Sequence, residues 1–229
     1  MKQFLALLAC VALAACTTTN VRKVNQAQNV APITSTRGLL VQPDVNLYVL
    51  TAAGMQERRE DWSRMAQTNL AEALKAELSS RTKTLRVLDP QVSMDGRVGQ
   101  LIRLNSAVGA SVAIFEYGPL KLPTKRGAFD WTLGDGAKLL GEAQGADYAL
   151  FVSANGTYAS AGRKALMVGA ALFGVAVPLG QQQIFASVVD LHTGRLVWTN
   201  VATAGPSADI RSAEGARSLA TSLLKDIPV

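Results

Sequence analysis

Apolar residues change their spacing several times along this chain, and each change marks an expected element. In residues 60–81, EDWSRMAQTNLAEALKAELSSR, apolar positions recur every three or four residues with charged residues between them, which predicts an amphipathic helix. Asp61 is its expected N-cap. Short runs rich in Leu, Val and Tyr at 39–41, 46–54 and 84–90 predict three strands around this helix.

The second half of the chain repeats the alternation of strand and helix. A helix is expected from Arg97, whose later part, GASVAIFEYG (109–118), is apolar and β-branched enough to form a strand instead. Thr132 to Asp135 has capping-box spacing and predicts a helix that ends at Gly145. The remaining expected elements are a buried strand at 146–154, a hairpin of 183–191 and 195–201 around His192-Thr193-Gly194, and a final helix from Ser207 or Asp209 to Ile227.

Strands and helices therefore alternate without an internal repeat or a change in composition. This order predicts an α/β fold: a single domain with a mixed β-sheet and amphipathic helices packed on it. A chain of this size is long enough to bury its own hydrophobic core.

The N-terminus carries a targeting pattern. MKQFLALLACVALAAC (1–16) has a positive start, an apolar run and small residues before Cys16, as in a secretory signal peptide. Its ending resembles the bacterial lipoprotein signal, in which the thiol of the Cys is acylated and the Cys becomes the first mature residue. The resemblance implies a signal peptide at 1–15 and lipidation at Cys16. In lipoproteins of this kind the residue after the Cys influences sorting, and because it is Thr17 and not Asp here, the resemblance favours the periplasmic face of the outer membrane over the inner membrane.

Residues 16–36 are expected to form the lipidated Cys and a flexible tether, because 17–36 are mostly small and polar and show no sustained period. The folded domain is expected at 37–229. Acyl chains at Cys16 would anchor it stably to the membrane without a spanning helix.

Charge and chemistry exclude several classes of function. The net charge is +6, but the basic residues are spread along the chain, and the cluster Lys121, Lys125 and Arg126 has no interleaved aromatic residues, so we expect no nucleic-acid partner. His192 is the single histidine and falls in an expected turn, and no Gly-x-Ser-x-Gly or phosphate-loop motif is present. We therefore expect no enzymatic activity, no cofactor and no metal site.

One stretch, KALMVGAALFGVAVPLG (164–180), is almost uncharged. Its apolar run at 165–179 is shorter than the roughly 20 residues that span a bilayer. It is therefore either a helix folded against its own domain or an exposed patch for self-association, partner docking or membrane contact. As a candidate interaction surface we take its large apolar residues: Leu166, Met167, Leu172, Phe173, Val175 and Val177.

Helix 60–78, strand GADYALFVSA (145–154) and hairpin QIFASVVDLHTGRLVW (183–198) together resemble Gram-negative periplasmic lipoproteins of uncharacterised function. The resemblance extends remotely to penicillin-binding-protein activator and curli-secretion-type lipoproteins, and it implies an α/β domain without catalytic residues. It implies a non-catalytic docking or assembly factor for another envelope complex of cell-wall synthesis, secretion or transport, with an envelope protein or a second copy as partner.

The alternative function is a periplasmic lipoprotein that binds a small ligand or a glycan. Trp62, Trp131, Trp198 and Tyr158 are then the candidate stacking residues, although packing in the core explains each tryptophan better.

Overall fold

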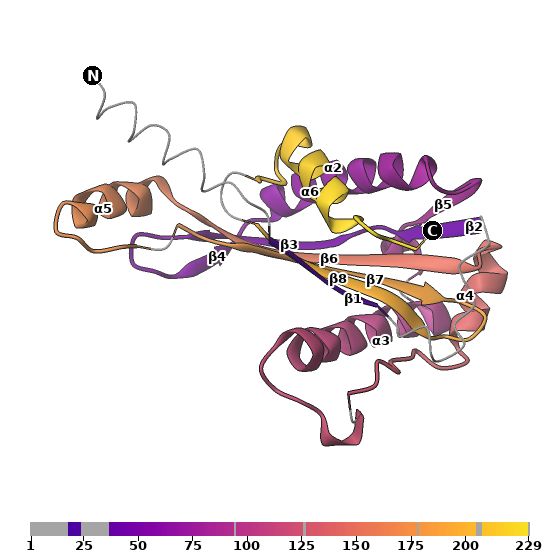
Figure 1. Cartoon of the computed structure of the whole chain (residues 1–229). Helices are drawn as coiled ribbons and strands as arrows, with labels where there is room; N and C mark the ends of the chain where they lie inside the picture. Colours follow the sequence, from indigo (N-terminus) through magenta and orange to yellow (C-terminus); the bar gives the residue numbers. More distant parts are fainter. Residues whose placement is uncertain are drawn as a thin grey trace.

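The computed structural model describes residues 18–23, 37–93, 95–125, 127–177, 179–204 and 208–228 of the chain (Figure 1). Eight strands in these residues form one mixed sheet, in which the order β1-β8-β7-β6-β2-β5 is extended by β3 on β6 and by β4 on β3. The strands are β1 (Thr18–Lys23), β2 (Arg37–Val41), β3 (Asp44–Leu50), β4 (Gln56–Arg58), β5 (Thr84–Leu88), β6 (Tyr148–Ala159), β7 (Gln182–Asp190) and β8 (Leu196–Ala204). The α-helices are α2 (Glu60–Ser79), α3 (Gly96–Val112), α4 (Ala137–Gln144), α5 (Ala161–Ala171) and α6 (Ala213–Leu223).

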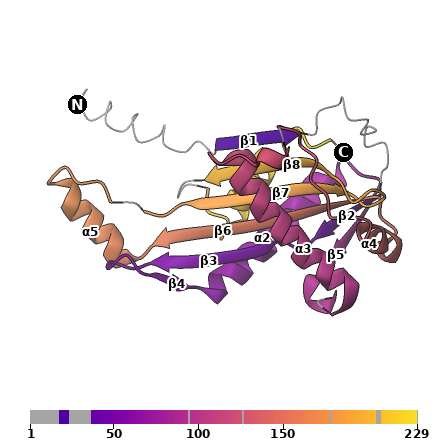
Figure 2. The same cartoon turned by 90° about the horizontal axis from the view of Figure 1, so that it is seen from below.

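Helices cover the two faces of the sheet unequally. Helices α2 and α6 lie side by side on one face, and α3 and α4 lie on the other (Figures 1 and 2). Leu70 and Leu74 of α2 and Leu219 of α6 are fully buried in the first layer. Leu101 of α3 and Leu140 of α4 belong to the second. The predicted α/β domain with a mixed sheet is confirmed.

Strand β6 is the centre of the sheet. Its first half pairs in parallel with β2, from Tyr148 opposite Gly38, and its second half pairs in parallel with β3, from Ser153 opposite Asp44. Gln42 and Pro43 separate β2 from β3 along this side of β6, because Pro43 has no N–H to donate to a strand ladder. On its other side β6 pairs along nine residues with β7, so the long hairpin extends past the helical layers (Figure 2).

Most of the predicted elements are confirmed, two details are wrong, and one open alternative is decided in favour of the helix. Asp61 is not the N-cap of α2, because the helix begins one residue earlier at Glu60 and the Asp61 carboxylate accepts from Arg59 Nε at 2.9 Å. The segment 109–118 does not switch to a strand, because α3 runs on into a π-helix, Ala113–Tyr117. Helix α6 begins later than Ser207 or Asp209, and the hydroxyl of Ser212 caps it by accepting from Gly215 N.

The capping box expected before α4 is also absent, although the helix and its end at Gly145 are confirmed. Gly145 has φ +60° and terminates α4 in the left-handed conformation. Thr132 Oγ1 instead accepts from Gly134 N at 2.9 Å and donates to Gly194 O at 3.0 Å. The threonine is thus committed to the β7–β8 turn and not to the helix.

Part of the expected tether belongs to the sheet. Residues Thr18–Lys23 form β1 and pair antiparallel with β8, from Thr18 opposite Thr203 to Lys23 opposite Trp198. These six residues are thus paired with the edge of the sheet, and the tether at 16–36 stays a prediction. The predicted signal peptide, Cys16 and residues 24–36 lie outside the described residues.

One helix in the described part of the chain, Gly96–Tyr117, is long and apolar enough to cross a membrane by length and composition. Its residues Leu101 and Val112 are buried against the sheet, and Gly109 lies against the ring of Phe185. We therefore interpret this helix as one that packs on the sheet of its own domain.

Candidate functional site

Helix α5 and the segment after it form an apolar surface at one end of the molecule. The helix stands off the tip of the β6–β7 hairpin, away from α2, α3, α4 and α6 (Figures 1 and 2). No residue of α5 is buried, and Leu172 and Phe173 just after it are 82% and 85% exposed. The alternative that this stretch folds into its own core is therefore wrong. We call the residues Leu166, Met167, Leu172, Phe173, Val175 and Val177 the α5 surface.

Hydrogen bonds fix where α5 begins and ends. The Ser160 hydroxyl caps the helix by accepting from Arg163 N at 3.1 Å, and Ser160 N donates to Leu50 O at 2.9 Å. At the other end Gly174 has φ +72°, a conformation that glycine adopts without strain, and Val175 N donates to Ala170 O at 3.0 Å. The α5 surface thus consists of a helix with defined ends and the segment that follows it.

The chain segment that contains α5 carries charge of a single sign. From Tyr148 to Val189 the only charged side chains are Arg163 and Lys164, both in the first turn of α5. Cations at the positive end of a helix dipole do not stabilise the helix. After Lys164 the helix carries no charged side chain, and none of its residues is buried. Exposed apolar side chains and two cations thus occur together on α5.

Strand register brings the start of the domain to the same end of the sheet. Thr18 lies opposite Thr203, Thr203 opposite Gln183, and Gln183 opposite Asn155. This row is four residues short of Ala159, where β6 leads into α5. Thr18, the first residue that the structure describes, therefore lies toward the end of the sheet that carries α5.

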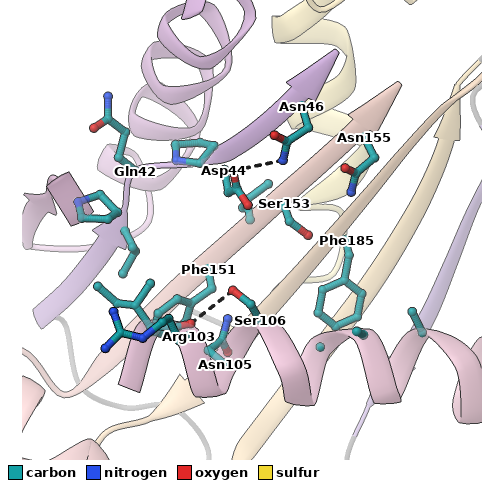
Figure 3. A pocket seen from close by; sticks show the side chains of 18 of the residues that line it. Gln42, Asp44, Asn46, Arg103, Asn105, Ser106, Phe151, Ser153, Asn155 and Phe185 are labelled. Atoms are coloured by element: carbon teal, nitrogen blue, oxygen red, sulfur yellow. Dashed lines mark hydrogen bonds between the residues drawn. The ribbon is translucent and has the colours of Figure 1, made fainter. Parts of the chain in front are cut away.

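A second site, a cleft of about 650 Å³, lies between α3 and the part of the sheet that no helix covers (Figure 3). Its floor is formed by side chains that alternate along three strands: Asp44 and Asn46 of β3, Phe151, Ser153 and Asn155 of β6, and Gln183 and Phe185 of β7. Arg103, Asn105 and Ser106 of α3 form one wall. The residues between them on these strands, such as Leu47 and Ile184, point into the core on the opposite face.

Sequence patterning missed this cleft. The alternation of Asp44, Val45, Asn46 and Leu47 predicts a strand with one polar face, but it does not say which helix lies over that face. The structure supplies this information, because α3 contacts the sheet at Gly109 and leaves the polar row beside it open.

The aromatic residues considered for ligand stacking lie elsewhere. Trp131, Trp198 and Tyr158 are buried. Trp62 packs edge-on against Tyr158 with ring centroids 5.9 Å apart, and the guanidinium groups of Arg59 and Arg211 lie 4.2 and 4.4 Å from the centre of its ring. Burial raises the pKa of the Tyr158 phenol. The Tyr158 hydroxyl donates to Gln182 Oε1 at 2.7 Å. These rings stabilise the domain and offer no open stacking face.

His192, the single histidine, has a structural partner. Its Nε2 lies 3.0 Å from Asp147 Oδ1, and Arg37 Nε donates to Asp147 Oδ2 at 2.9 Å. The hydrogen bond from Arg37 is the main cause that lowers the pKa of Asp147. The three side chains join the starts of β2 and β6 to the β7–β8 turn, so they fasten the end of the sheet that lies opposite α5.

The fold is that of an α/β domain with a mixed sheet. No family model matches the chain, and no curated protein matches it significantly. The solved structures similar to it include the PelC dodecamer from Paraburkholderia phytofirmans, with a TM-score of 0.41 and 14% identity over 91% of this chain and 95% of that chain. A substituted PelC dodecamer from the same organism gives 0.39 and 14%, over 91% and 96%. At scores this low nothing is transferred from those assemblies to this chain.

Proposed function

We propose that this protein is a non-catalytic lipoprotein of the periplasmic face of the outer membrane, where it docks another envelope protein. Two contacts hold the domain against the bilayer: the lipid at Cys16 and the α5 surface. The rest of the domain then faces the periplasm in one orientation. The observation that carries the proposal is the strand register, which puts Thr18 and the base of α5 at the same end of the sheet.

The chemistry of α5 supports lipid as the occupant of the α5 surface. Leu172 and Phe173 offer apolar area at the tip, and Arg163 and Lys164 can approach anionic head groups. An α-helix of 11 residues is about 16 Å long, so α5 is too short to span the hydrocarbon layer and would lie in its interface.

A docking role requires no catalytic residues, and none is part of this proposal. Among the described residues, no group of three or more His, Cys, Asp and Glu side chains is placed to hold a metal ion. His192 is engaged with Asp147 at the opposite end of the sheet from α5.

The membrane contact is tested with a spin label in the purified full-length lipoprotein, reconstituted into vesicles of phosphatidylethanolamine and phosphatidylglycerol. The sequence has cysteine only at positions 10 and 16, of which the first leaves with the signal peptide and the second carries lipid, so Phe173→Cys introduces one free thiol. We expect the nitroxide at position 173 to collide with dissolved oxygen more than with a water-soluble nickel chelate, as a label in the acyl region does.

Val87→Cys is the matched control. Val87 is also a large exposed apolar residue, but it lies on β5, at the end of the sheet away from α5 (Figure 1). Its label is expected to stay accessible to the nickel chelate. Equal accessibility of the labels at 173 and 87 to that reagent would refute the membrane contact.

The docking role is tested by photocrosslinking in intact envelopes. The wild-type chain is expected to give discrete products with one envelope protein, and a Cys16→Ser chain, which cannot be lipidated, is expected to lose them. Products at multiples of the mass of this chain would identify a second copy as the partner. Absence of any crosslinked protein would refute the docking role.

A further inference from the structure

The cleft between α3 and the sheet combines apolar side chains with polar ones, and nearly all of the polar ones are neutral. Seven of its side chains are amides: Gln42, Asn46, Gln67, Gln91, Asn105, Asn155 and Gln183. Among the described lining residues only Asp44 and Arg103 carry charge, and they have opposite signs. A cleft of this composition offers many paired donors and acceptors but no net charge for an ionic ligand.

Three of the amides form a row across adjacent strands. Asn46 of β3 lies opposite Asn155 of β6, and Asn155 lies opposite Gln183 of β7. Neighbouring strands are about 4.8 Å apart. This spacing is close to the length of one pyranose unit in an extended chain, so successive sugar residues laid across the strands would each meet an amide.

The amides are available to a ligand. Asn155 and Gln183 are exposed, and neither side chain makes a hydrogen bond or ion pair with another described residue. Each amide can donate to one hydroxyl and accept from another, which is the pattern that a sugar ring presents. Asn46 donates to Asp44 Oδ1 at 3.2 Å, an interaction that orients its amide across the floor of the cleft (Figure 3).

Apolar rings lie directly beside the row. Phe185 is next but one to Gln183 on β7, and it lies opposite Ser153 on β6. Phe151 lines the same cleft farther along β6 (Figure 3). An aromatic side chain next to a row of hydrogen-bonding groups suits the two kinds of surface on a pyranose, its C–H face and its hydroxyl edge.

We infer that this cleft binds one extended neutral oligosaccharide, which lies across β3, β6 and β7 with its hydroxyls on Asn46, Asn155 and Gln183 and a ring face on Phe185. The cleft lacks a pair of facing carboxylates, since Asp44 is the only acid among its described lining residues, so the site binds the glycan without cleaving it. This site is independent of the membrane contact, because no residue of α5 lines the cleft.

To test this, the purified full-length protein is titrated in detergent with three neutral 1,4-linked hexasaccharides: α-linked glucose, β-linked glucose and N-acetylglucosamine. Hexagalacturonate is the anionic comparison. We expect saturable binding of at least one neutral hexamer and none of hexagalacturonate. Asn155→Val combined with Gln183→Val removes two amides while keeping residues that favour a strand, and should weaken that binding about tenfold or more.

Two further variants make the result specific. Ala110→Trp, on the exposed face of α3 that lines the cleft, should abolish binding by filling the space without touching an amide. Gln56→Val removes an equally exposed strand amide on β4, outside the cleft, and should leave the affinity unchanged. The inference is overturned if no neutral hexamer binds saturably, if hexagalacturonate binds as well as they do, or if the double variant binds like the wild type.

Discussion

Replacing Leu172 and Phe173 by serine separates the stability of the domain from its contact with the membrane. The two side chains are 82% and 85% exposed, so the folded protein gains little from them. We expect the double variant, Leu172→Ser with Phe173→Ser, to keep its free energy of unfolding within about 0.5 kcal/mol of the wild type. Serine is chosen because a lysine would be attracted to anionic head groups and would mask the loss of apolar contact.

The expected loss of membrane affinity follows from the same exposed fractions. Complete burial of a Leu or Phe side chain contributes about 1.5 to 3 kcal/mol, and most of that amount remains available when more than four-fifths of each side chain is exposed. A conservative value for the pair is about 3 kcal/mol, which corresponds to a decrease in partitioning on the order of a hundredfold.

The assay uses the chain from Thr17 onward, which lacks the predicted lipidation site, and measures sedimentation with vesicles that contain phosphatidylglycerol. Urea unfolding followed by circular dichroism checks the fold of each variant. Leu120→Ser serves as a control, because Leu120 is an exposed apolar residue after α3 and not part of α5. Equal partitioning of variant and wild type, partitioning of neither, or loss of folding in the double variant would refute the reasoning.

Two further predictions concern the end of the sheet opposite α5. Asp147→Asn should lower the free energy of unfolding at neutral pH and have a smaller effect in acid. The pKa of Asp147 is lowered in the folded state, mainly by the hydrogen bond from Arg37. The stabilisation by the Asp147 carboxylate is therefore present above the unfolded-state pKa of about 3.9 and is lost as the pH falls through the folded-state pKa. Urea unfolding at several pH values measures this, and Asp135→Asn, an exposed carboxylate, should change little at any of them; a pH-independent effect of Asp147→Asn would contradict it. Gly194→Ala should cost about 2 kcal/mol or more, because Gly194 has φ +71° and a Cβ there would lie 2.1 Å from Gly134 O; an unchanged urea midpoint would show that the turn can relax.

Periodicity predicted the elements that are stabilised by one buried face. The apolar repeat through Leu70, Leu74 and Leu78 predicted α2, and these residues are buried in the structure. The His192-Thr193-Gly194 turn predicted the β7–β8 hairpin, because glycine with positive φ closes it. In these elements the residues that cause the structure lie within the segment itself, so the element can be predicted without knowledge of distant residues.

Elements that depend on distant partners could not be predicted in this way. Thr18–Lys23 is mostly polar and forms a strand because β8 offers a free edge, which no local pattern reveals. Thr132 has the spacing of a capping residue, but its hydroxyl donates to the backbone oxygen of Gly194. The cleft likewise depends on where α3 lies relative to Asn46 and Asn155, and helix placement is a tertiary property.

The sequence indicated which residues form the α5 surface but not where they lie in the fold. The sequence left open whether 165–179 is core, interface or membrane contact, and the structure removes the core alternative because α5 has no buried residue. The contact that it makes stays a prediction. The roles of Cys16 and of the signal peptide also stay predictions, since both lie outside the described residues.

Helix α5 follows directly on β6, and the chain that returns from it rejoins the sheet before β7. Ala159 N donates to Leu179 O at 2.8 Å and Thr157 N donates to Gln181 O at 2.9 Å, so β6 stays paired up to the residue before Ser160, the N-cap of α5. The start of α5 is thus fixed when the domain folds. Contact through α5 then loses little further conformational entropy, and preorganisation allows a small apolar area to give useful affinity.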